Sequence, residues 1–348
     1  MEELLPKDNE NILASLVGPL QPSEREGFAF EDMITCDFCL RSNPPTRIAC
    51  LYCGSSLPVT ESSARFRKPT LIQPDKSKPG YNSIFIGETQ VTLSGAKLQE
   101  AGEFLTLAPE SLEKLIKAPV PLPLAHTATE EEAILVSKRL GDLGLEVCNL
   151  SDAQLGISES CVVRARSVQF DEAGFKFRSS ISGNELEVEY SDLLLMVQGR
   201  LIIKTTEVKE RKSRTSENEI LDASEFFSDQ PVIDIYSSTN SETWRITTNN
   251  FDFSCLGDQK TLVAGENIFK LAKLIQSRAS QVQVDNHYNS LRQSLECVWG
   301  LEQETKSRGW RRDAPGRLSI EAATTLSNET QFTRYSRLQY YKRRKLIE

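Results

Sequence analysis

The chain has 348 residues, of which 26% are charged, and its formal net charge is -8. This length allows two or three domains, and no apolar run reaches the roughly 20 residues that a membrane-spanning helix needs. The acidic start has no basic segment leading into an apolar core, so we expect no signal peptide and a cytoplasmic location. The negative charge also argues against a protein that coats nucleic acid over its whole surface.

Residues 1–30 predict a flexible arm, because they are acidic and only weakly periodic. Residues 31–58 hold a cysteine cluster with the spacing C-x2-C-x10-C-x2-C, formed by Cys36, Cys39, Cys50 and Cys53. Each pair can wrap its backbone around one ion, and four thiolates complete the tetrahedral shell that zinc prefers. The sequence therefore predicts one structural zinc ion, with a redox C-x2-C motif or a chance spacing as the alternatives.

A site with four protein thiolates has no open position, so it would not activate water. Gly54 follows the last ligand, where the backbone has to turn sharply. The remaining cysteines are scattered among apolar neighbours, and isolated cysteines in a reducing compartment are usually buried hydrophobes. We expect this of Cys148, Cys161, Cys255 and Cys297.

The cysteine segment, with Asn43 four residues after Cys39, resembles the Ran-binding-protein type of four-cysteine zinc finger over residues 34–54. Ile34 stands where that family has a tryptophan. The ending ACLYCGSSLP is also similar to bacterial zinc ribbons. That second resemblance implies a scaffold and names no ligand.

The two residues after Cys39 separate the activities known in the finger family. Some members bind ubiquitin through a Thr-Phe pair; this chain has Leu40 and Arg41 there, so ubiquitin binding is not implied. Others bind single-stranded RNA through arginines and stacked bases, which would here use Arg41, Arg47, Phe38 and Tyr52. The alternative is that Phe38 and Tyr52 cover the zinc core.

Residues 59–98 predict a linker, because they are polar and contain three prolines, with one short strand at 83–86. Residues 99–152 then predict a small unit of helix, strand, helix and strand. Its proline-containing strand near 120–124 suits a sheet edge, because proline cannot donate to a ladder. Thr129 and Glu132 form a capping box for the second helix, and Gly144 suits a left-handed C-cap.

Residues 116–150 resemble the second half of the C-terminal domain of the bacterial ribosomal stalk protein, mainly at packing positions. The resemblance implies the fold only, because the lysine-rich factor-binding helix has no counterpart here. A ferredoxin-like split unit is an equal alternative.

Residues 157–290 predict an antiparallel β domain, with a mobile charged insertion at 207–229. An amphipathic helix follows, with Ile268, Leu271, Ala272 and Ile275 on one face. The region resembles bacterial pleckstrin-homology-like domains, which implies binding of lipids, peptides or neighbouring domains. A lipid headgroup site would draw on the basic residues Arg164, Arg166, Lys176 and Arg178, which otherwise form a solvated face.

Residues 291–348 predict a helical, basic tail. From Thr305 onward it has eleven Lys or Arg against four Asp or Glu, with aromatic residues between them. This composition favours nucleic-acid binding, or weak membrane docking through Arg343, Arg344 and Lys345. The alternative is a helix that packs Phe332, Tyr335 and Leu338 against another domain.

The sequence as a whole predicts an α+β protein that is not an enzyme. The only histidines, His126 and His287, have no suggestive neighbours, and no phosphate-binding, hydrolase or metalloprotease motif is present. We expect an interaction or scaffold module for protein partners, held together by zinc. The alternative is an RNA- or DNA-associated protein that uses the finger and the tail through Arg41, Arg47, Tyr52, Arg343, Arg344 and Lys345.

Overall fold

The computed structural model describes residues 28–64, 66–75, 78–87, 93–157, 162–179, 185–211, 219–240, 242–314 and 317–345. All but the end of the predicted arm at 1–30 lies outside these residues. The chain forms two compact units, Met1–Phe66 and Arg67–Glu348, which are described separately. No helix in the described ranges is both long enough and apolar enough to cross a membrane.

The first unit has little regular structure. It contains a 3-10 helix η1 (Phe30–Asp32), two short antiparallel strands β1 (Ile34–Thr35) and β2 (Ser42–Asn43), and a helix α1 (Glu61–Ala64). Its core consists of Ile34, Leu57 and two of the cysteines. A core this small leaves the fold dependent on the cysteine cluster.

The second unit begins with a three-stranded antiparallel sheet of order β4-β3-β5. Its elements are β3 (Tyr81–Phe85), α2 (Gly95–Leu105), α3 (Pro109–Ile116), β4 (Leu122–Thr127), α4 (Glu130–Asp142) and β5 (Val147–Ser151). The predicted helix-strand-helix-strand order is present, β4 is an edge strand, and Gly144 has a left-handed φ of 93°. The Thr129 hydroxyl caps α4 by accepting from the backbone N–H of Glu132 at 3.3 Å.

The boundary between predicted linker and predicted domain is wrong in one respect. The central strand of this sheet, β3, comes from the stretch read as a linker. Four of its five residues are buried, so it is a core strand. The predicted short strand at 83–86 overlaps β3, but the prolines and charges around it led to its assignment to a linker and not to the sheet.

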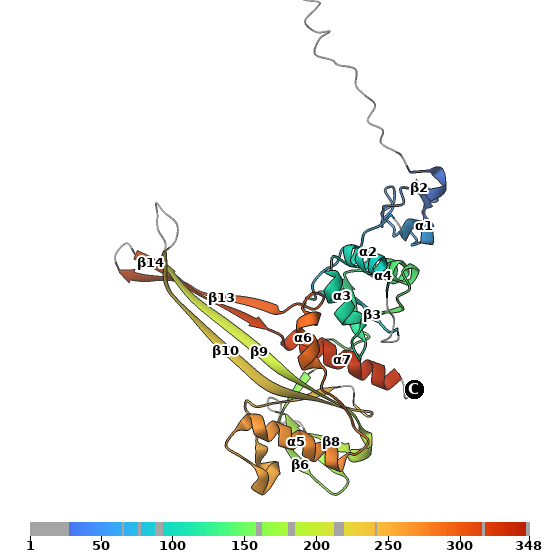
Figure 1. The fold of residues 1–348 in the computed structure, drawn as a ribbon. Helices are drawn as coiled ribbons and strands as arrows, with labels where there is room; N and C mark the ends of the chain where they lie inside the picture. The colour runs from blue at the N-terminus through green and yellow to red at the C-terminus, as the bar shows by residue number, and fades with distance from the viewer. Residues whose placement is uncertain are drawn as a thin grey trace, which may run out of the picture. The chain divides into compact units, whose positions relative to one another are not determined.

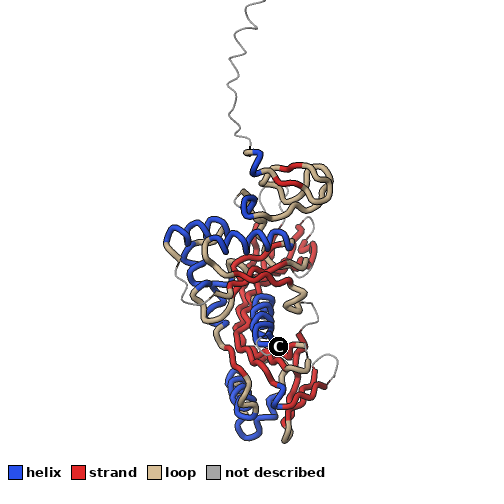
Figure 2. Tube along the Cα trace, turned by 90° about the vertical axis from the view of Figure 1, so that its right-hand side faces the viewer, coloured by secondary structure: helices blue, strands red, loops and turns tan. Residues whose placement is uncertain are grey.

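A nine-stranded sheet dominates the rest of this unit, in the order β13-β14-β9-β10-β11-β6-β7-β8, with β12 beside β9. Neighbours are antiparallel except for β6 with β11 and β9 with β12. Most described residues here lie in strands, with helices packed at their sides (Figures 1 and 2). The strands are β6 (Val162–Phe170), β7 (Gly174–Ser179), β8 (Glu185–Glu189), β9 (Leu193–Arg211), β10 (Glu219–Ser237), β11 (Thr243–Thr247), β12 (Gln283–Asp285), β13 (Glu302–Ala314) and β14 (Arg317–Ser327). The helices are η2 (Tyr190–Asp192), η3 (Phe253–Gln259), α5 (Ala264–Arg278), α6 (Tyr288–Leu295) and α7 (Glu329–Lys345).

The content of helix and curled sheet fits the predicted α+β class. The region at 157–290 does not form a sheet of its own, because β13 and β14 from the predicted tail add to the same sheet. The described parts of the predicted mobile insertion, 207–211 and 219–229, continue β9 and β10 as strands. Residues 212–218 of that insertion lie outside the described residues.

Two hydrophobic cores cover opposite faces of the inner half of β9 and β10. Leu195, Val197 and Leu201 belong to one core, with α6, α7 and the small sheet. Met196 belongs to the other, with α5 and β6–β8, and the predicted stripe on α5 is buried there. Gly199 lets α7 approach closely, since a Cβ at this position would lie 2.5 Å from the Phe332 ring.

The basic tail ends in a helix that is largely internal. Phe332, Tyr335 and Leu338 are buried, which confirms the prediction that this face packs on another part of the chain. Two of its arginines, Arg334 and Arg337, are buried as well. Part of the positive charge counted in the tail is therefore not on the surface.

Candidate metal centre

The four cysteines predicted to bind metal lie together at one end of the first unit. Their four sulfur atoms lie within 4.8 Å of one another. Sγ of Cys36 is 3.6 Å from Sγ of Cys53, and Sγ of Cys39 is 3.5 Å from that of Cys50. Zn–S bonds of 2.3 Å in a tetrahedron would separate the sulfurs by about 3.8 Å. The sulfur cluster thus has the size of a single metal's ligand shell.

The two cysteine pairs have the same backbone geometry. The residue after the second cysteine, Leu40 or Gly54, has a left-handed φ of 57° or 76°. Its N–H donates to the carbonyl of the first cysteine, at 2.8 Å for Leu40 and 3.0 Å for Gly54. Each first cysteine in turn donates its own N–H five residues ahead, Cys36 to Arg41 and Cys50 to Ser55. The repeated spacing therefore produces two equivalent knuckles around one point.

Asn43 ties the two knuckles together. Its amide nitrogen donates to the Arg41 carbonyl at 2.9 Å and to Sγ of Cys50 at 3.4 Å. Its amide oxygen accepts from the N–H of Leu51 at 2.8 Å. The side chain is completely buried, so it links β2 to the second knuckle and supports one of the sulfurs.

The electrostatics favour a thiolate at Cys50. Burial opposes its ionisation, but donors from the backbone of Tyr52 and Cys53 and from Asn43 lower the pKa of the Cys50 thiol to about 6. The hydroxyl and backbone of Ser55 likewise lower the pKa of Cys53. Metal ligands have to be deprotonated, so these donors prepare Cys50 and Cys53 for a cation. At Cys39 the backbone donor from Arg41 is outweighed by burial and the neighbouring thiols, which raise the pKa of this thiol to about 12.

The aromatic residues of the knuckles face solvent. Phe38 is 78% exposed and Tyr52 56% exposed, so the expectation that they cover the metal core is wrong. Leu40 and Leu51 are also exposed, and the Arg41 guanidinium lies 4.8 Å from the centroid of the Tyr52 ring. We call Phe38, Leu40, Arg41, Leu51 and Tyr52 the knuckle patch.

The other basic residues predicted to bind nucleic acid or lipid have different settings. Arg47 is exposed on the first unit, while Arg343, Arg344 and Lys345 form the last turn of α7 in the second. Three of the four strand residues considered for a headgroup site are in ion pairs: Arg164 with Glu329 at 2.7 Å, Lys176 with Glu187 at 2.5 Å and Arg178 with Glu185 at 2.7 Å. This arrangement matches the solvated face rather than a phosphate pocket.

The isolated cysteines are only partly buried. Cys148 and Cys297 pack against the first core of the second unit, and Cys255 packs against the second core. Burial raises the pKa of each of the three thiols, as expected for inert packing residues. Cys161 lies outside the described residues.

A buried polar cluster in the second unit was not predicted. Asp152 accepts from Arg334 of α7, from the Asn82 amide at 2.9 Å and from the N–H of Gly80 at 3.0 Å. His126 lies 3.5 Å from the same carboxylate. Burial opposes ionisation of Asp152, but the nearby His126 ring and the bonds from Arg334 and Asn82 outweigh it and hold the pKa of that carboxyl well below its usual range.

This cluster fastens α7 to the small sheet. Asn82 also accepts from the indole N–H of Trp299 at 2.9 Å, so strands β3 and β4, the segment after β5, the segment after α6 and helix α7 meet there. All these side chains are almost completely buried. Bonded partners in this cluster lie as far as 217 positions apart in the sequence, which is why no local pattern reveals them.

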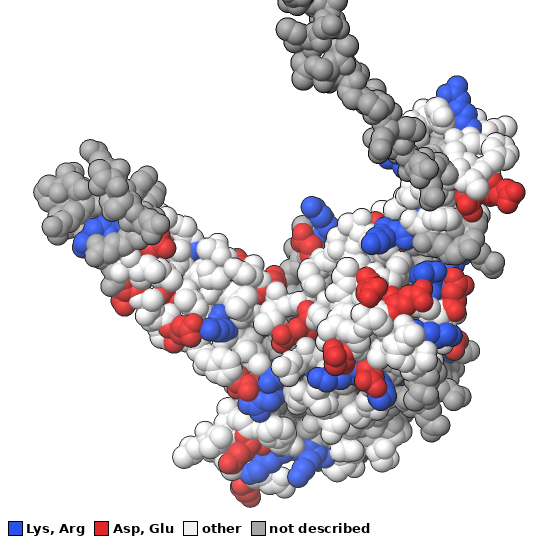
Figure 3. Space-filling model, turned by 45° about the horizontal axis from the view of Figure 1, so that its top comes forward, with Lys and Arg blue, Asp and Glu red and all other residues white. Residues whose placement is uncertain are grey.

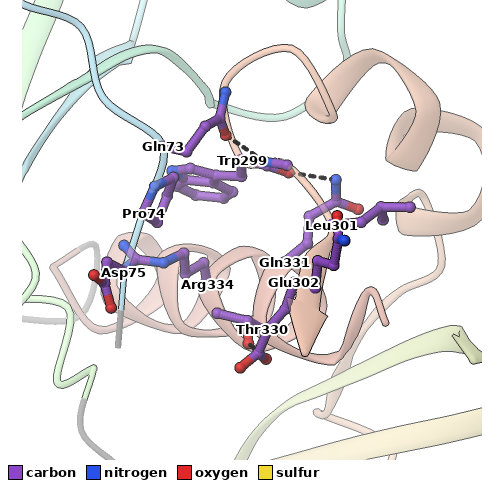
Figure 4. Close-up of a pocket in the computed structure, with 11 residues that line it drawn as sticks. Gln73, Pro74, Asp75, Trp299, Leu301, Glu302, Thr330, Gln331 and Arg334 are labelled. Carbon is purple, nitrogen blue, oxygen red and sulfur yellow. Dashed lines mark hydrogen bonds between the residues drawn. The ribbon is translucent and has the colours of Figure 1, made fainter. Parts of the chain in front are cut away.

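A cavity of about 490 Å³ lies between Gln73, Trp299 and Gln331 (Figure 4). Its polar side chains bond to neighbouring groups: Gln73 accepts from the backbone N–H of Gly300 at 2.7 Å, Gln331 donates to the Trp299 carbonyl at 2.7 Å, and Thr330 donates to Glu302 at 2.6 Å. These bonds occupy the groups that would otherwise converge on a ligand. We therefore take the metal centre, not this cavity, as the candidate functional site.

Comparison with protein-family models, curated proteins and solved structures finds no match to this chain. The function has to be argued from the geometry of the site.

Proposed function

We propose that Cys36, Cys39, Cys50 and Cys53 hold one structural zinc ion, and that the zinc module presents the knuckle patch to a protein partner. Four thiolates at tetrahedral spacing are the ligand set that zinc favours in structural sites. The small core around them makes the metal the main source of folding free energy. On this proposal the chain is a non-enzymatic interaction module.

The exposure of the knuckle patch is the observation that carries this proposal. Apolar and aromatic side chains gathered around a rigid centre are typical of the core of a protein interface. The metal fixes the backbone of both knuckles, so the patch would pay little conformational entropy on binding. We therefore expect a partner that offers an apolar surface and a hydrogen-bond acceptor for the Arg41 guanidinium.

A protein partner fits this unit better than a nucleic acid. The described part of the unit carries the acidic residues Glu31, Asp32 and Asp37 near its basic residues Arg41 and Arg47. Phosphate contacts dominate nucleic-acid affinity and need an excess of positive charge. RNA or DNA remains the second candidate, because the stacked pair of Arg41 and Tyr52 is also a platform for a base.

The absence of catalysis and the cytoplasmic location are part of the same proposal. A closed four-thiolate shell supplies no open metal position for substrate. His126 is buried against Asp152, and His287 is bonded to Asp285 at 3.2 Å. Thiolate ligands also require a reducing compartment.

Metal content tests the first half of the proposal. Purified full-length protein should contain about one zinc ion per chain by elemental analysis. The double variant Cys36→Ser/Cys50→Ser should contain almost none. Cys148→Ser is the control and should keep the metal. Zinc retained by the double variant, or iron in its place, would refute the assignment.

Affinity purification of the tagged protein from its own cells tests the second half. Partner proteins that still co-purify after nuclease treatment should be absent from the double variant Phe38→Ala/Tyr52→Ala. They should still co-purify with Phe30→Ala, a control that alters an 87% exposed residue of the same unit. Each variant must first show normal zinc content. Recovery that disappears with nuclease, accompanied by bound RNA or DNA, would favour the second candidate.

A further inference from the structure

Four strands of the second unit continue beyond the helices that cover the sheet. We call this part the outer arm; it consists of 202–211 of β9, 219–229 of β10, β13 and β14. These strands run together away from the helices in Figure 1. No residue of β9 from Ile202 to Arg211 is buried, although β9 is an inner strand of the sheet. A sheet of this size normally needs a covered apolar face to be stable.

The two faces of the outer arm differ in composition. Side chains alternate along a strand, and the pairing registers of β9 with β10 and β14 assign each residue to a face. The face that contains Val208 also contains Ile202, Ala223, Phe227, Ala322 and Leu326. Ile220 and Ile320 extend it toward the tip. The ion pair of Lys204 with Glu225, at 2.9 Å, lies on this face and confirms the register.

The opposite face is more polar. Among the paired residues of β9, β10 and β14, its apolar residues are Ile203, Phe226 and Ala323, against eight on the Val208 face, whereas each face carries a hydroxyl pair and an ion pair. Phe226 is its largest apolar residue. Charged residues are scattered among uncharged ones on the part of the arm seen in Figure 3. The Val208 face is therefore the one that lacks its cover.

We propose that the Val208 face is covered by the same face of a second copy of this chain. The arm is about 31 Å long and about 19 Å wide from strand rise and spacing, so each copy would bury about 600 Å². The total of about 1,200 Å² lies at the lower end of the range for specific protein interfaces. The small residues at the centre, Ala223 and Ala322, allow two sheets to approach to the usual separation of about 10 Å.

The pattern on the face is complementary to itself under a two-fold axis across the strands. Such an axis places the inner end of one arm over the tip of the other. Phe227 of β10 would then meet Ile220 of the other copy, and Leu326 of β14 would meet its Ile320. In the central strand, Lys204 of one copy would meet Glu210 of the other, twice by symmetry. Opposite charges in this position favour the second copy over an unrelated partner.

Sedimentation velocity on the full-length protein tests the proposal, between about 1 and about 200 µM because an interface of this area commonly binds in the micromolar range. We expect a monomer–dimer equilibrium. Phe227→Glu should raise the dimer Kd by about tenfold or more. Phe226→Glu is the matched control, since both rings are well exposed, at 68% and 59%, and lie on opposite faces. This control should leave Kd within about threefold of the wild type.

A charge exchange gives an independent readout. Lys204→Glu and Glu210→Lys should each weaken self-association, because each places like charges together at both symmetric positions. A mixture of the two single variants should restore dimers, since every pair across the interface is then opposite in charge. Residues 204 and 210 lie about 20 Å apart along one strand, so this rescue cannot arise within one copy.

A wild type that stays monomeric at every concentration would overturn the proposal. So would equal loss of dimer in Phe226→Glu and Phe227→Glu, or a charge-exchange mixture that stays as monomeric as its components. A far-ultraviolet circular-dichroism spectrum like that of the wild type is required of each variant, so that loss of the dimer does not come from loss of strand structure.

Discussion

The inner and outer halves of β9 and β10 are the same pair of strands in two different environments. In the inner half both faces are covered, and Leu195, Met196 and Val197 are all buried in succession. In the outer half, from Ile202 to Arg211, no side chain of β9 is buried. The sequence changes accordingly, from the continuous apolar run LLLMV to the largely polar TTEVKE, whose one apolar residue is Val208. A continuous apolar run marks a strand buried on both faces, whereas a polar stretch with isolated apolar residues marks a strand that is not.

The largest difference should appear between a buried ion pair of α7, the helix that covers the inner half, and an exposed ion pair on the outer half. Arg334 and Asp152 are almost completely buried in the covered region. Arg334→Met would leave the carboxylate without its main partner and should lower the free energy of unfolding by about 3–5 kcal/mol. Lys204→Met removes an arm pair whose side chains are 43% and 61% exposed, and it should change stability by less than about 1 kcal/mol. Urea denaturation measures both, and similar losses would refute the distinction.

Apolar truncation should show the same contrast with a smaller amplitude. Val197 is completely buried, and Val197→Ala should cost about 2–3 kcal/mol because it removes methyl groups from a packed core. Val208→Ala, on the same strand, should cost less than about 1 kcal/mol in the monomer. The measurement has to be made at a protein concentration well below the dimer Kd, because a second copy would bury Val208. A large loss at Val208 under those conditions would show that the arm has an internal cover.

Local patterns predicted the metal centre because its determinants lie within eighteen residues. The Cys-x-x-Cys spacing specifies the knuckles, and Gly54 adopts the expected left-handed turn. The N-cap at Thr129 and the stripe on α5 were equally local and are present, although the Glu132 carboxylate accepts from the N–H of Thr70 and does not complete the predicted capping box. The exposure of Phe38 and Tyr52 was not predictable from the same segment, because a knuckle can direct these side chains inward or outward.

Long-range pairing explains most of what the sequence did not reveal. The hairpin of β13 and β14 was read as a helical basic tail, although Pro315-Gly316 between its strands is a turn signal. β14 pairs with β9 more than a hundred residues earlier, and this pairing converts a charged stretch into an outer strand. Arg334 looked like part of a nucleic-acid surface because its partner, Asp152, is 182 positions away.

The smallest expected effect is a change in the pH dependence of the covered half. The pKa of Asp152 is depressed in the folded state, so its ionisation stabilises the fold above the unfolded pKa of about 4 and that stabilisation is lost as pH falls toward the folded pKa. Below about pH 4 the wild type should therefore lose stability more steeply than Asp152→Asn, by up to about 1.4 kcal/mol per pH unit. Denaturation curves at several acidic pH values measure the two slopes. Parallel slopes for wild type and Asp152→Asn would mean that the buried carboxylate does not couple α7 to the small sheet through its charge.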